Sequence, residues 1–187
     1  MIHRGSRGEA QALTSAWEGE TVKPPVYFSF WEDGEALVFE GWRASAARIH
    51  PAARAGLLCE ELWRYDTMEF FVASGDVTRY LEFNLCPNGA WWAAAFCEPR
   101  TPQPEYDAAS RLHVEASGRV TADGWSCRMR VPLTELMEWG WRMEDCRMAA
   151  CAVLCSGEGR IFLTSTDLRP EKPDFHRPWD WEKPEWA

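Results

Sequence analysis

The sequence contains no long apolar run, and this absence limits the kinds of protein that the chain can be. No stretch approaches the ~18 consecutive apolar residues that a membrane-spanning helix requires, so we expect no transmembrane segment. Residues 1–8 are polar and lack the apolar core of a secretory signal. These two absences predict a cytoplasmic protein.

Positive charge is also scarce. The 187 residues contain 20 Lys and Arg against 29 Asp and Glu, which gives a net charge of −9. Sequence-independent binding to nucleic acid requires a basic surface, and so does adsorption to an anionic membrane. Both classes of partner are therefore disfavoured.

Motifs for catalysis and for metal binding are missing as well. The sequence has no nucleophile elbow, no phosphate-binding loop and no His-containing zinc motif. The four histidines have no ligand spacing, and the seven cysteines match no zinc pattern. We expect no metal site, reduced thiols and no enzymatic activity.

Tryptophan is the residue present in excess, with 12 in the chain. Each indole is large and carries an N–H that needs a hydrogen-bond partner, so 12 are hard to bury together. Several are expected at the surface, where exposed aromatic rings most often stack on sugars or contact another protein.

Short strand-like runs bounded by turn signals recur along the chain. We predict strands at 26–31, 36–42, 67–73, 79–86, 90–97, 111–116, 124–131, 147–155 and 160–164. Turns are expected at Asn88-Gly89 and Ser117-Gly118, one helical turn within 45–58 and a short helix at 133–139. Many strands with little helix predict an all-β fold, a two-sheet antiparallel β-sandwich.

The composition predicts one domain over residues 1–187. Its core is expected at about 26–166, because the predicted strands lie there. Residues 167–187 form a tail rich in Pro and Trp, which we expect to pack on that core.

Alternation along the predicted strands assigns side chains to the two faces of a sheet. In 67–73 it turns Met68 inward and Glu69 outward, and in 79–86 it turns Glu82 and Asn84 outward. An outer face with two carboxylates is either a solvated face with ion pairs or a ligand groove. Carboxylates make strong hydrogen bonds to the hydroxyl groups of a sugar.

The same reasoning turns two further residues outward, and it leaves open whether their strands lie in the same sheet as Glu69. If Asn88-Gly89 closes a two-residue hairpin, Pro87 pairs with Ala90 and Trp91 stands outward. In the strand at 124–131, alternation turns Arg128 outward as well. Glu82, Trp91 and Arg128 are therefore candidate binding residues.

Two motifs and the tail carry a family resemblance. The motifs are Trp63-x-x-Asp66-x-x-Glu69-Phe70-Phe71 and Glu82-Phe83-Asn84-x-x-Pro87-x-Gly89. Over about 27–179 the chain resembles the family 9 carbohydrate-binding modules and the wider DOMON-like superfamily. Residues 172–178 resemble the closing motif of its intracellular, stand-alone branch. The resemblance implies a β-sandwich that binds a small saccharide or a glycoconjugate without catalysing a reaction.

The resemblance also implies which residues hold the sugar. Trp63 matches the first stacking aromatic and Glu69 the carboxylate, while Asn84 stands where the family has an arginine. The second aromatic falls near Phe175. The polar contacts that replace the family's amide are Lys172, Asp174 and His176.

Three alternatives remain open. The tail tryptophans Trp179, Trp181 and Trp186 would serve a protein-interaction module or a homodimer with a vestigial sugar site. Glu69 and Glu82 would serve a glycan-processing enzyme, which needs two carboxylates. Some superfamily relatives bind haem through Met and His, and Met68 and His176 are the corresponding pair, but Met68 is assigned to the core, so we expect no cofactor.

Overall fold

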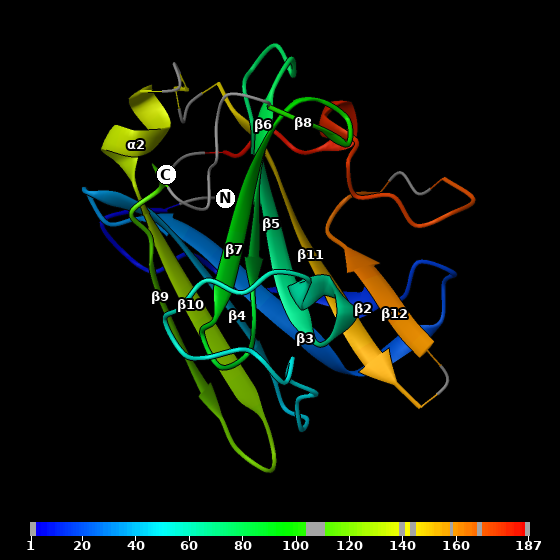
Figure 1. The fold of residues 1–187 in the computed structure, drawn as a ribbon. Helices are drawn as coiled ribbons and strands as arrows, with labels where there is room; N and C mark the ends of the chain where they lie inside the picture. The colour runs from blue at the N-terminus through cyan, green and yellow to red at the C-terminus, as the bar shows by residue number, and fades with distance from the viewer. Residues whose placement is uncertain are drawn as a thin grey trace.

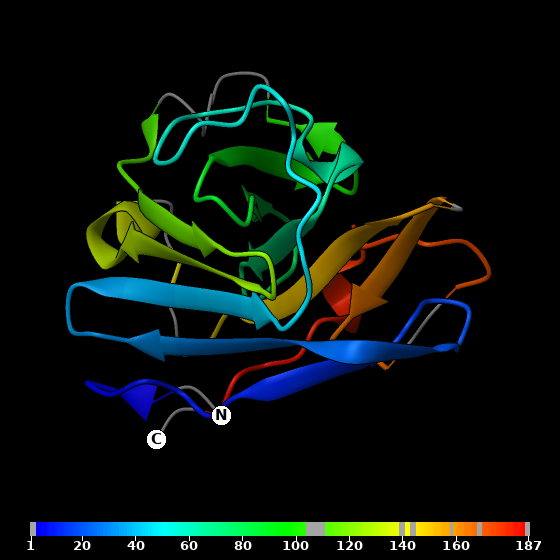
Figure 2. The same ribbon diagram turned by 90° about the horizontal axis from the view of Figure 1, so that it is seen from below.

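The computed structural model describes residues 3–103, 111–138, 141–142, 145–157, 159–167 and 170–185. It confirms the all-β prediction, because two six-stranded sheets lie face to face. Figure 2 shows these sheets as two layers. Nearly all strand pairs are antiparallel, as expected for a sandwich, and the short β1 alone pairs in parallel, with β3.

The first sheet has the strand order β1-β3-β4-β10-β9, and β2 pairs with β3 beside this path. Its strands are β1 (His3–Arg4), β2 (Gln11–Ser15), β3 (Thr21–Glu32), β4 (Ala36–Arg43), β9 (Glu115–Val120) and β10 (Trp125–Pro132). The predicted strand at 111–116 is thus displaced toward the C-terminus. Its turn lies at Thr121, whose N–H donates to Gly124 O, and Gly118 is a ladder residue paired with Cys127.

The second sheet has the order β12-β11-β5-β6-β7-β8, and its strands are labelled in Figure 1. Its strands are β5 (Thr67–Ala73), β6 (Tyr80–Leu85), β7 (Trp91–Glu98), β8 (Thr101–Pro102), β11 (Arg147–Ser156) and β12 (Gly159–Thr164). The helices in the described part of the chain are short: η1 (Leu62–Arg64), α2 (Leu133–Glu138) and η2 (Pro178–Asp180). The helical turn predicted within 45–58 is absent, because these residues contain no helix. The nearest helical turn is η1, a few residues further along the chain.

The main core lies between the two sheets. Phe70 stacks on Phe83 with ring centroids 4.5 Å apart and also packs on Phe39 of the first sheet at 4.7 Å. A Cβ on Gly41 would lie 2.6 Å from Met68 Cγ, so the small residue lets the sheets approach. The core also begins earlier than predicted, because Leu13 of β2 is buried in it.

The β6–β7 hairpin has a different register from the predicted one. Gly89 N–H donates to Cys86 O and Cys86 N–H donates to Ala90 O, so the loop has three residues, with Gly89 at φ +87°. Pro87 therefore opens the turn and does not pair with Ala90. The one-residue slip exchanges the faces of the whole strand.

Trp91 is consequently a core residue, 8% exposed, and its prediction as an outward binding residue was wrong. Its neighbour Trp92 takes the outward position and pairs with Asn84.

The C-terminal tail packs on the outer face of the second sheet. Trp181 is only 2% exposed; its ring lies 5.1 Å from Phe71, and its Nε1–H donates to Phe175 O. Trp181 is thus part of a second apolar cluster, which removes it from the alternative in which the tail tryptophans contact a partner. Trp179 is 49% exposed, and Trp186 lies outside the described residues.

No helix in the described part of the chain is long and apolar enough to cross a membrane.

Candidate functional site

A cleft of about 430 Å³ lies on the outer face of the second sheet, between the strands and the tail. Aromatic rings, carboxylates and guanidinium groups line it together. The lining residues are Trp63, Glu69, Glu82, Trp92, Phe96, Arg100, Pro102, Val153, Arg160, Phe162, Pro173, Phe175 and His176.

Glu69 and Glu82 form the polar floor of this cleft. Glu69 on β5 lies opposite Asn84 on β6, and Glu82 lies opposite Phe71, so the two glutamates are diagonal neighbours on one face. They are only 4% and 6% exposed. Strand alternation predicted both positions, and burial makes each carboxyl group costly to ionise.

Asn84 lies beside the carboxylates on the same face of the second sheet, but it does not line the cleft. Its Nδ2 donates to Glu82 Oε1 over 2.6 Å, and the side chain is completely buried. Its Oδ1 has no hydrogen-bond partner within the described part of the chain. The residue therefore positions Glu82 in this structure.

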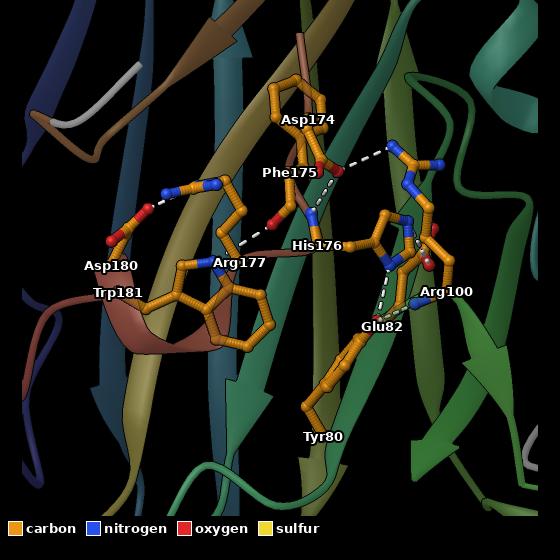
Figure 3. Close-up of polar contacts among 9 residues, drawn as sticks. All are labelled: Tyr80, Glu82, Arg100, Asp174, Phe175, His176, Arg177, Asp180 and Trp181. Carbon is orange, nitrogen blue, oxygen red and sulfur yellow. Dashed lines mark hydrogen bonds and ion pairs between the residues drawn. The ribbon is translucent and has the colours of Figure 1, made fainter. Parts of the chain in front are cut away.

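His176 links the tail to Glu82 (Figure 3). Its Nε2 lies 3.7 Å from Glu82 Oε2, and its Nδ1 lies 2.7 Å from the Tyr80 hydroxyl. The Arg100 backbone N–H already donates to the Tyr80 oxygen. The consistent arrangement has the Tyr80 hydroxyl donating to Nδ1, which leaves the imidazole proton on Nε2, facing Glu82.

Burial dominates the protonation of these groups. It raises the pKa of Glu82 to about 7, against the opposing effects of the Asn84 hydrogen bond and of Arg100. It also raises the pKa of Glu69 well above its usual range, and the charge of Glu82 adds to this rise. Burial, assisted by Arg100, lowers the pKa of His176 to about 4, so the imidazole is neutral at pH 7.

Two arginines contribute the positive charge of the cleft, and sequence reasoning found neither. Arg160 lies on β12, where its guanidinium carbon is 5.4 Å from the centre of the Phe162 ring. Alternation in the predicted strand 160–164 would have placed it outward. Arg100 lies in the β7–β8 hairpin, in a left-handed conformation with φ 61°, and no local pattern indicates its position.

Asp174 lies at the edge of the cleft and fixes the tail. Its Oδ1 accepts a hydrogen bond from Arg100 Nη2 at 2.7 Å and another from the His176 backbone N–H. The predicted contact residue Asp174 is thus engaged with Arg100. Lys172 is exposed and does not line the cleft.

Aromatic rings form the walls of the cleft. Trp63 of η1 packs against Trp92 with ring centroids 5.5 Å apart and planes at 66°. Phe175 of the tail lies 6.1 Å from Phe162 of β12. Trp63 and Phe175, two of the candidate binding residues, therefore both line the cleft, and Trp92 lines it in place of its neighbour Trp91.

Arg128, a candidate binding residue from alternation, does not line this cleft, because its strand belongs to the other sheet. It lies on β10 in the first sheet, with its guanidinium carbon 5.0 Å from the centre of the Trp31 ring. Alternation gives the face of a strand and carries no information about which sheet the strand joins.

The residues proposed for haem do not meet. Met68 is fully buried in the main core, while His176 lies on the opposite face of the second sheet. Among the described residues, no group of three His, Cys, Asp or Glu side chains is arranged to hold a metal ion.

Comparison with known proteins shows the fold. No protein-family model matches the chain, and no curated protein is similar to it in sequence. Among solved structures, a proposed carbohydrate-binding protein from Bacteroides uniformis is similar, with a TM-score of 0.69 and 18% identity over 93% of this chain and 84% of the other.

Family 9 carbohydrate-binding modules from Caldicellulosiruptor kristjanssonii are similar as well. One, in complex with cellotriose, has a TM-score of 0.56 and 11% identity over 89% of this chain and 83% of the other. Another, in complex with glucose, has a TM-score of 0.55 and 11% identity over 86% and 75%. The chain therefore has the fold of a carbohydrate-binding module.

Proposed function

We propose that this protein binds a small saccharide, or the terminal unit of a glycoconjugate, in the cleft between the second sheet and the tail. The observation that carries the proposal is the joint presence of half-buried aromatic rings and two deeply buried carboxyl groups at the same surface. Such a cleft offers apolar faces to the C–H side of a sugar ring and hydrogen-bonding groups to its hydroxyls.

Each lining residue has a defined part in this proposal. Trp63 and Trp92 supply the aromatic wall next to β7, and Phe175 supplies the wall formed by the tail. Glu69 and Glu82 hydrogen-bond neighbouring hydroxyls, and Arg160 donates from the side of β12. The fold similarity to modules solved with cellotriose and glucose supports a sugar as the ligand class.

The test is titration of the protein with glucose, xylose, galactose and cellotriose, followed by calorimetry and tryptophan fluorescence. Saturable binding that is lost in Trp63→Ala and in Glu69→Ala supports the proposal. Absence of binding to every sugar overturns it.

The second candidate is an interaction module, and among the tail tryptophans that the structure describes it depends on Trp179. This side chain is 49% exposed, and the Arg177 guanidinium carbon lies 5.3 Å from the centre of its ring. Exposed aromatic and arginine side chains are enriched in protein interfaces. A concentration-dependent dimer that Trp179→Ala disperses would favour this function.

A further inference from the structure

The hydrogen-bonding pattern behind the cleft distinguishes Glu69 from Glu82. The Asn84 amide nitrogen donates to Glu82, and the Asn84 amide oxygen is buried without a donor. A buried acceptor without a donor is costly. The residue directly across the strand pair from Asn84 is Glu69, whose side chain makes no hydrogen bond or ion pair within the described part of the chain.

A carboxylate only accepts hydrogen bonds, whereas a carboxylic acid also donates one. Protonation of Glu69 therefore supplies a donor on the residue that lies directly across the strand pair from Asn84, whose amide oxygen is unsatisfied. Burial and the neighbouring charge of Glu82 favour the same state, since they raise the pKa of Glu69. Glu69 is the neutral member of the pair.

Glu82 is the ionised member. It receives the Asn84 Nδ2–H group, and the Nε2–H group of neutral His176 faces it. Burial raises the pKa of Glu82 to about 7, and the Asn84 hydrogen bond and Arg100 oppose that rise. Above this pH the pair carries one negative charge, and it resides on Glu82 because burial and the charge of Glu82 hold the pKa of Glu69 well above its usual range. Of the other groups facing the pair, Tyr80 and Cys151 are neutral, since burial raises both of their pKa values.

A carboxylic acid beside a carboxylate, in a cleft suited to a sugar, is a general acid beside a general base. We propose that this cleft catalyses the interconversion of the two anomers of a reducing sugar, with Glu69 as the acid and Glu82 as the base. The inference depends on the proposed sugar binding. It requires the two carboxyl groups to reach the two oxygens bonded to the anomeric carbon.

The reaction balances without an oxidant or a cofactor. Glu82 takes the proton of the anomeric hydroxyl, Glu69 gives its proton to the ring oxygen, and the bond from the anomeric carbon to the ring oxygen breaks as the carbonyl forms. The aldehyde end then rotates about its bond to the next carbon. Ring closure on the other face returns one proton to Glu69 and takes the other from Glu82, so both side chains recover their initial states.

The experiment follows the optical rotation of freshly dissolved α-D-glucose with and without the wild-type protein, and calorimetry measures glucose binding in the same buffer. We expect a rate above that of buffer that increases with protein concentration and saturates with glucose. Glu69→Gln and Glu82→Gln should each lower the protein-dependent rate by about a hundredfold or more, the usual effect of losing an acid or base. Glu60→Gln, an exposed carboxyl outside the cleft, should retain it.

Binding of glucose by the wild-type protein without acceleration of anomer exchange overturns this inference and leaves the proposed function intact. Failure to bind any reducing sugar of the panel overturns both; if another sugar of the panel binds and glucose does not, its anomers are followed in the same way. Equal rates in the wild type and in both glutamine variants also overturn the assignment. Should either variant unfold, Asp in place of Glu at the same position provides the comparison, because it keeps the carboxyl group and withdraws it by one methylene.

Discussion

Asn84 and Glu82 lie two residues apart on β6, and the amide of one donates to the carboxylate of the other over 2.6 Å with both side chains almost fully buried. Sequence alternation predicts that they share a face. Their direct contact makes Asn84 a support for Glu82 behind the cleft surface.

Asn84→Ala should therefore weaken the protein and raise the pKa of Glu82 further, because the Asn84 hydrogen bond lowers that pKa in the wild type. The loss of a bond to a buried charged group predicts a free-energy cost of about 1.5–3 kcal/mol. Urea denaturation measures the cost, and carboxyl carbon NMR measures the titration. An unchanged Glu82 titration would show that Asn84 does not support it.

The adjacent residues Trp91 and Trp92 provide a matched test of the hairpin register. Trp91 points into the main core, so Trp91→Ala should cost about 3–5 kcal/mol of stability. Trp92 lines the cleft, so Trp92→Ala should weaken sugar binding by at least tenfold with a smaller loss of stability. Denaturant unfolding and calorimetry on both variants separate the two roles. If Trp92→Ala lost the larger share of stability and Trp91→Ala weakened sugar binding, the two-residue turn would be correct and the observed register would be excluded.

These two residues also show how far the sequence alone predicts the site. Period-two alternation on β5 and β6 predicts correctly that Glu69 and Glu82 face outward. On β7 it fails, because the result depends on whether Pro87 pairs or opens the turn, and Asn-Gly is compatible with both loops. The two loops differ by one residue in the pairing register, and the local sequence pattern does not distinguish between them.

Contacts between segments that are distant in the sequence could not be predicted either. Arg100 meets Asp174 across 74 positions, and Tyr80 meets His176 across 96. The tail could be expected to pack on the domain, but its partners follow from the path of the whole chain. Arg128 shows the same limit, since its strand joins the first sheet.

The stability of the protein should depend on pH through Glu82. Its pKa in the folded state, about 7, is above the ordinary value of 4.5, so the folded state retains a proton that the unfolded state loses. This contribution of Glu82 to the free energy of unfolding is fully present below about pH 4.5. It is lost as the pH rises through about 7, and the loss amounts to roughly 3 kcal/mol. Relative to the wild type, Glu82→Gln should become more stable over this interval.

His176 opposes this trend and makes the variant comparison necessary. Its folded pKa of about 4 is below the ordinary 6.5, so its contribution is present above about pH 6.5 and is lost as pH falls through about 4. His176→Gln should therefore steepen the loss of stability between pH 4.5 and 6.5. Urea midpoints measured at several pH values for the two variants check both signs. Parallel curves for the wild type and both variants would contradict the assigned shifts.

Asp66 holds the segment that carries Trp63 in place. One of its carboxylate oxygens accepts the Arg48 N–H at 2.9 Å, and the other accepts the Cys155 N–H of β11 at 2.6 Å. The side chain is buried, so Asp66→Ala leaves two backbone donors without acceptors, each at a cost of about 1–3 kcal/mol. The free energy of unfolding, measured by urea denaturation, should therefore fall by about 2–6 kcal/mol. Asp66→Asn keeps one acceptor oxygen, so its stability should lie between that of the alanine variant and that of the wild type.

In the folded fraction of each variant, calorimetry should show weaker sugar binding, because η1 begins four residues before Asp66 and presents Trp63 to the cleft. If binding stays at the wild-type level while stability falls, Asp66 supports the sandwich alone and Trp63 is positioned by its contact with Trp92.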